Sequence, residues 1–145
     1  MSAGTLITTV QEALTLNGQT FNSRRLKQTT SINEMSTRTV TVTTTSATFL
    51  KLSTAPGAGQ YIATDLRYLR LTNLDPTNFV IVGLSDTSGD TIYFKLEAGQ
   101  SLIFHNDDIE ANTSGAAFSA FSQWDTLTMD ADTASVDVEM VVASA

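Results

Sequence analysis

Residues 135–142 read Ser-Val-Asp-Val-Glu-Met-Val-Val, and this stretch decides the class of fold. Its apolar side chains fall on alternate positions: Val136, Val138, Met140 and Val142. The positions between them carry the polar Ser135, Asp137 and Glu139, and Val141 is the one exception to the alternation. Successive side chains of a β-strand point to opposite faces of a sheet, so this alternation predicts a strand with one buried face and one solvent face.

The same period of two recurs along most of the chain. Residues 37–45 carry Thr at every odd position, with Val40 and Val42 between them. Further strands are predicted in residues 66–74, 79–84, 91–96, 101–104, 116–121 and 124–129. Turn signals such as Asp75-Pro76-Thr77-Asn78 separate them. About eight short strands at regular spacing predict an all-β fold, which we expect to be an antiparallel two-sheet β-sandwich of jelly-roll type.

The first 36 residues have a different pattern. Residues 14–16 alternate and are followed by Asn17-Gly18, a pair that is typical of a tight hairpin turn. Beyond the turn the chain is polar as far as Met35. The sequence therefore predicts two parts, an extended N-terminal arm or hairpin in residues 1–36 and a β-sandwich domain in residues 37–145.

Charge is distributed unevenly along the chain. Residues 1–51 carry five Lys or Arg and two acidic residues, whereas residues 98–145 carry eight acidic residues and no Lys or Arg. Such asymmetry indicates a basic segment that seeks an acidic partner, and we expect the arm to lie on the acidic C-terminal sheet of a neighbouring copy. A loosely held polar N-terminus is the alternative. The candidate interface residues are Leu14, Leu16, Phe21, Arg24, Arg25, Lys27, Thr39, Thr41, Thr43, Asp137 and Glu139.

Composition argues against several classes of protein. The formal net charge is −7, whereas a nucleic-acid-binding surface needs clustered Lys and Arg, so no nucleic-acid partner is expected. The chain has no apolar run near the ~20 residues that a membrane helix requires, and its start lacks the charged region of a signal peptide. No Cys is present, which rules out disulfides and Cys-based zinc sites.

Catalytic chemistry has little support in the sequence. The chain has a single His, His105, and no Gly-x-Ser-x-Gly motif, so no nucleophilic triad is predicted and neither is a cofactor. Residues 105–110 are rich in carboxylates and could hold a cation, or form a solvated loop. Trp124, Phe118 and Phe121 could stack on a sugar ring or pack in a core.

Several stretches resemble one known family. They are residues 65–80 (DLRYLRLTNLDPTNFV), 94–104 (FKLEAGQSLIF), 11–18 and 133–145. They are similar to small virion structural proteins of tailed bacteriophages, especially those of marine and cyanobacterial hosts. The resemblance implies a non-enzymatic particle component that is assembled in the host cytoplasm.

Within the particle, the resemblance most specifically implies a capsid decoration (cement) protein. Such a protein binds the major capsid protein over contacts between coat subunits, commonly as a homotrimer, on the capsid surface. A tail, fibre or neck component is the alternative position. A module that binds host glycans through Trp124 is a further alternative from another class.

Overall fold

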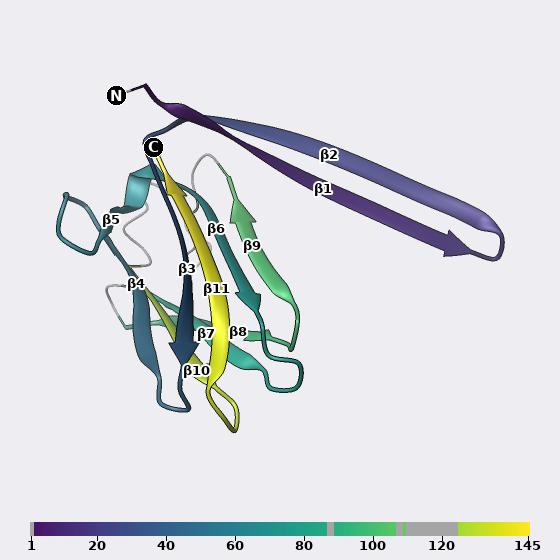
Figure 1. Ribbon diagram of the computed structural model, residues 1–145. Coiled ribbons are helices and arrows are strands. Elements are labelled where there is room, and N and C mark those ends of the chain that lie inside the picture. The colour runs from purple at the N-terminus through teal and green to yellow at the C-terminus, as the bar shows by residue number, and fades with distance from the viewer. Residues whose placement is uncertain (1, 87–88, 107–108, 110–124) are drawn as a thin grey trace.

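The computed structural model describes residues 2–86, 89–106, 109 and 125–145. Within these residues the chain forms a β-sandwich from which a long hairpin projects (Figure 1). The hairpin consists of β1 (Gly4–Leu16) and β2 (Gln19–Ile32), and we call it the arm. The sandwich strands are β3 (Glu34–Val42), β4 (Ala47–Ser53), β5 (Tyr61–Ile62), β6 (Leu66–Asn73), β7 (Val80–Ser85), β8 (Thr91–Leu96), β9 (Ser101–His105), β10 (Thr126–Ala131) and β11 (Val136–Ser144). A short 3₁₀ turn, η1 (Ala63–Asp65), precedes β6.

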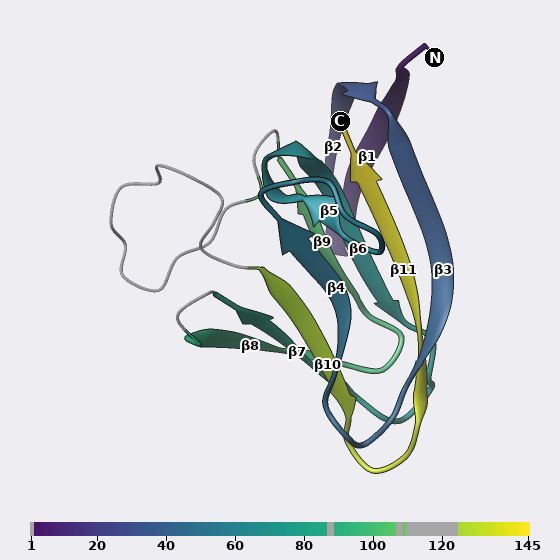
Figure 2. The same ribbon diagram turned by 90° about the vertical axis from the view of Figure 1, so that its left-hand side faces the viewer.

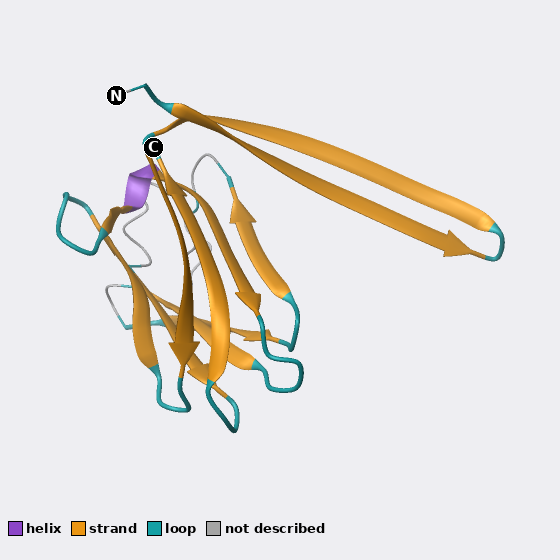
Figure 3. Ribbon diagram, in the orientation of Figure 1, coloured by secondary structure: helices purple, strands orange, loops and turns teal. Residues whose placement is uncertain are grey.

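The sandwich has the strand order of a jelly roll. One sheet has the order β3-β11-β6-β9 and the other β5-β4-β10-β7-β8. Apart from the short parallel pair β4–β5, all neighbouring strands are antiparallel. The chain passes repeatedly between the two sheets, which lie side by side in Figure 2, with β3 and β11 on the right and β10, β7 and β8 on the left. Loops join the strands at the ends of the sandwich (Figure 3). This arrangement confirms the predicted all-β, two-sheet sandwich.

Alternation along β11 sorts the side chains as the sequence predicts. Val136, Val138, Met140 and Val142 are each at most 1% exposed and belong to the main core. The core continues through the inward side chains of β6, β7 and β10, including Leu69, Leu71, Val82 and Met129. Because β7 pairs with β10 on one side and β8 on the other, its apolar run is buried as a central strand.

The far side of β11 is buried only at its C-terminal end. There Val141 and Ala143 pack with Tyr68 of β6 and Ile32 at the end of the arm, and Leu6 of β1 packs against this group. The beginning and end of the arm thus cover one end of the outer face of the β3-β11-β6-β9 sheet. We call this sheet surface, which faces away from the core, the outer sheet face.

The arm is longer and more regular than the sequence pattern indicates. Twelve residue pairs connect β1 with β2, and Asn17 and Gly18 form the turn with φ values of 51° and 77°. The predicted Asn-Gly hairpin is therefore present. The hairpin ends at Ile32 and β3 begins at Glu34, so the sandwich starts before residue 37, where the sequence placed it.

Strand β3 ends at Val42, three residues short of the predicted end at Thr45. Thr43 accepts a hydrogen bond from the backbone N–H of Thr45 at 3.3 Å, a local turn that competes with extended structure. The chain then turns into β4 in the opposite sheet. The predicted strand at 116–121 lies outside the described residues. None of the helices in the described part of the chain has the length and apolarity needed to span a membrane.

Candidate functional site

The arm has two faces of different composition. Cross-strand partners share a face, and the register pairs Leu14 with Phe21, Val10 with Arg25 and Thr8 with Lys27. Alternation places Leu6 and Leu16 on this side too, and Leu6 contacts the sandwich. We call this side the inner arm face. Arg24 pairs with Gln11 on the opposite side of the hairpin, so the three predicted basic residues are divided between two faces.

Apolar side chains on the inner arm face are exposed beyond the sandwich. Leu14, Leu16 and Phe21 are each 55–56% exposed and Val10 is 40% exposed. The arm leaves the sandwich near the C-terminus and extends well past β9 (Figure 1). The structure thus brings the predicted residues Leu14, Leu16, Phe21, Arg25 and Lys27 onto one surface.

The outer sheet face collects a second group of predicted residues. Thr39 lies directly opposite Glu139, and Thr41 lies opposite Asp137. Thr41 donates a hydrogen bond of 2.7 Å to Asp137, and Arg70 forms an ion pair with Glu139. Thr43 is not part of this row, because β3 has already ended at Val42.

A groove of about 440 Å³ separates the arm from the outer sheet face. Leu6, Ile7 and Val10 line it on the arm side, and Val141, Ile103 and Met35 line it on the sheet side. These residues form no recognisable group in the sequence, because the groove exists only where the hairpin crosses the sheet. The alternation in residues 6–16 is the signal that could have indicated β1.

Two of the four stretches that carry the bacteriophage resemblance, residues 65–80 and 94–104, meet at one end of the sandwich. Asn73 is fully buried, and its Nδ2 donates to the carbonyl oxygens of Asn78 (2.8 Å) and Leu96 (3.2 Å). Its Oδ1 accepts from the N–H of Asp75 at 2.9 Å, and its own N–H donates to the carbonyl of Gln100. The motif residues therefore join the β6–β7 loop to the β8–β9 loop, and their observed role is structural.

Asp75 organises the β6–β7 loop through its carboxylate. The backbone N–H groups of Asn78 and Thr77 donate to Oδ1 at 2.7 and 2.8 Å. These bonds favour the ionised form and hold the pKa of Asp75 below its ordinary value of 3.8.

Replacing Asp75 by Asn should therefore remove a pH-dependent part of the stability. A carboxyl group whose pKa is lower in the folded state makes its full contribution to the stability of the fold at pH values above its unfolded pKa of about 3.9. That contribution is lost as the pH falls through the folded pKa. We expect the Tm difference between the native protein and Asp75→Asn to be largest at neutral pH and to close toward pH 2. Thermal unfolding by circular dichroism across this range measures it, and a difference that does not change with pH would contradict the assignment.

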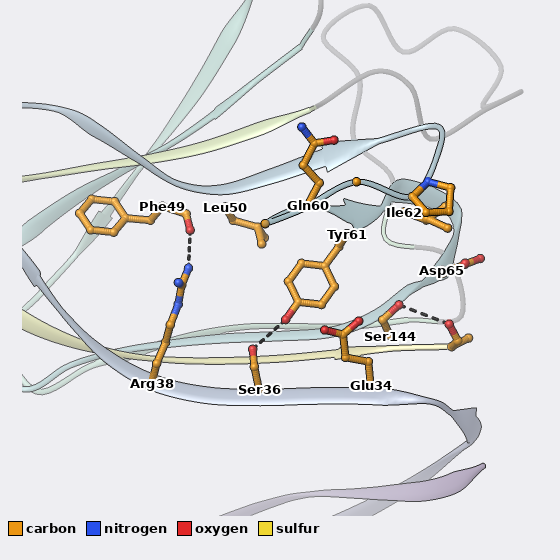
Figure 4. Close-up of a pocket in the computed structure, with 14 residues that line it drawn as sticks. Glu34, Ser36, Arg38, Phe49, Leu50, Gln60, Tyr61, Ile62, Asp65 and Ser144 are labelled. Atoms are coloured by element: carbon orange, nitrogen blue, oxygen red, sulfur yellow. Dashed lines mark hydrogen bonds between the residues drawn. The ribbon is translucent and has the colours of Figure 1, made fainter. Parts of the chain in front are cut away.

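A polar pocket of about 470 Å³ lies where β3 approaches β4 and β5 (Figure 4). Ser36 and Tyr61 share a hydrogen bond of 2.8 Å across it, and Arg38 donates to the carbonyl of Phe49 at 2.6 Å. Glu34 and Asp65 also line it. The two hydrogen bonds connect the edge strand β3 of one sheet with β4 and the edge strand β5 of the other, so they hold the two sheets together along this side of the sandwich.

The residues considered for catalysis or ligand binding are only partly described. Nδ1 of His105 is buried and has no hydrogen-bond partner, and no group of three potential metal ligands occurs in the described ranges. Asp107, Asp108 and Glu110 of the candidate cation loop lie outside those ranges, as do Phe118, Phe121 and Trp124.

Comparison with known proteins identifies no family. No protein-family model matches the chain, and no curated protein matches it. Among solved structures, the chain is similar to one described as "Bacillus endospore appendages form a novel family of disulfide-linked pili". The two chains are 14% identical with a TM-score of 0.47, over 96% of this chain and 89% of the other.

Proposed function

We propose that this chain is a non-enzymatic structural protein of a bacteriophage virion, a capsid decoration protein that binds over contacts between coat subunits and stabilises the shell. The observation that carries the proposal is the arm, which extends from a compact sandwich with its apolar side chains exposed. The resemblance of residues 65–80 and 94–104 to small virion proteins is the reason for proposing that the particle is a bacteriophage virion.

The arm has the physical properties of an assembly element. An isolated two-stranded hairpin is at best marginally stable in water, and it gains stability when its apolar face packs against another surface. Among the described strands, β1 and β2 pair only with each other, so each has an edge without a strand partner there, and its backbone groups could add to a neighbour's sheet. A subunit with such an arm is suited to bridging neighbours in a shell.

The sandwich suits the other half of this role, which is to act as a rigid brace. Its core runs through both sheets, and the buried Asn73 network joins two loops at one end. The polar outer sheet face, with Thr39, Thr41, Asp137 and Glu139, offers a surface on which coat or sister subunits could bind. The proposed partners are accordingly the major capsid protein and further copies of this chain, as in a trimer.

Copy number tests the proposed position in the particle. In density-purified virus particles, quantitative mass spectrometry should find one copy of this chain for every few coat subunits, because a decoration protein follows the lattice of the shell. A few to a few tens of copies would contradict decoration and indicate a tail, fibre or neck component. Absence from the particle would overturn the virion assignment altogether.

A further inference from the structure

The end of the arm presents an apolar and cationic surface that this chain does not itself cover. Leu14, Leu16 and Phe21 are more than half exposed, and they share the inner arm face with Arg25. Nearer the sandwich, the same face packs through Leu6 against Tyr68, Val141 and Ala143 of the outer sheet face. The inner arm face is thus already complementary to this sheet where the two meet.

The outer sheet face has the matching chemistry. Met35 and Ile103 are 55% and 42% exposed at the groove beneath the arm, beside the more buried Val141. Farther along β11, Glu139 is paired with Arg70, whereas the carboxylate of Asp137 has no ion-pair partner among the described residues and accepts a hydrogen bond from Thr41. The groove, which Arg70 and Glu139 also line, is therefore followed along β11 by the carboxylate of Asp137.

The spacing of the proposed contact residues along β2 also matches the spacing of their proposed partners along β11. Phe21 and Arg25 are four residues apart on one face of β2, and Val141 and Asp137 are four residues apart on one face of β11. At about 3.3 Å per residue, each pair spans roughly 13 Å. A packed arm whose Phe21 occupies the groove near Val141 can hence place Arg25 beside Asp137.

We propose that the end of the arm docks on the outer sheet face of a second copy of this chain, with Leu14, Leu16 and Phe21 at the groove and Arg25 paired with Asp137. The contact joins two different surfaces, so each copy can both give and receive an arm. Such head-to-tail contacts close into a ring when the rotation between copies permits it, and otherwise propagate as an open chain. The inference does not depend on the virion assignment, because it concerns the purified protein alone.

Charge reversal of the proposed ion pair provides the test. In sedimentation equilibrium of the full-length protein, Arg25→Glu and Asp137→Arg should each weaken self-association about tenfold or more, and the double variant should recover most of the loss. Arg24→Glu is the matched control, because the same change on the opposite arm face should leave association unchanged. Thermal unfolding checks that each variant stays folded.

A second variant and its matched control test the apolar part of the proposed contact. Phe21→Ser should abolish association, whereas Leu26→Ser, at a similarly exposed position on the opposite arm face, should not. A native protein that remains monomeric up to about 100 μM would overturn the proposal. So would equal losses for Arg24→Glu and Arg25→Glu. Association that is sensitive to Arg25 and insensitive to Asp137 would also overturn it, since that result indicates docking elsewhere, such as arm against arm.

Discussion

Replacing Asn73 by Asp should destabilise the fold by about 3 kcal/mol or more, although the two side chains have nearly the same shape. The Nδ2 of Asn73 donates to the carbonyls of Asn78 and Leu96, and a carboxylate oxygen in its place would face two acceptors. Because Asn73 is fully buried, water cannot replace the hydrogen bonds that the two carbonyl groups would lose. Protonation of the new Asp would relieve only one of the two contacts.

Chemical denaturation measures this effect, with Asn22→Asp as its control. Asn22 is exposed near the end of the arm, so the same chemical change there should alter the free energy of unfolding by no more than about 0.5 kcal/mol. If Asn73→Asp were equally mild, the network that joins the β6–β7 and β8–β9 loops would not be a determinant of stability.

Val138→Asp should prevent stable folding or lower the Tm by more than about 10 °C. Val138 is fully buried on β11, between Val40 of β3 and Asn73 of β6. No cation lies among the buried residues of this core, so the new carboxylate would have to be protonated or exposed by unfolding.

The neighbouring outer sheet face provides the comparison for Val138. Thr39→Val changes an exposed strand residue opposite Glu139, and its effect on stability should stay within about 0.5 kcal/mol. Differential scanning calorimetry of both variants measures the contrast. Similar Tm losses for the two would contradict the assignment of inner and outer sheet faces.

The sequence by itself determined the elements whose causes are local. Alternation along residues 135–142 predicted both the strand β11 and its buried side, because the period of two follows from strand geometry alone. Asn17-Gly18 predicted the hairpin turn, because these residues adopt positive φ at low cost. The spacing of strands and turns was sufficient for a jelly-roll-like sandwich.

Features that depend on surroundings were decided by the tertiary structure. The polar residues of β2 carry no clear alternation, and β2 forms because twelve of its 14 residues have a partner in β1. Alternation alone places the adjacent Arg24 and Arg25 on opposite faces of a strand, but only the hairpin register places Arg25 beside Val10 and Arg24 beside Gln11. Likewise, Asn73 is an ordinary polar residue of the predicted strand 66–74 until the fold brings Leu96 beside it.

The candidate interface shows the same division. Composition predicted a basic arm and an acidic C-terminal region, but Thr39, Thr41, Asp137 and Glu139 became one surface only when β3 paired with β11. The groove beneath the arm forms only because the hairpin also crosses over this sheet. Local patterns thus specified the strands and their faces, because side-chain alternation is a property of one strand. Only the tertiary structure specified which faces meet, because pairing and crossing join residues far apart in the chain.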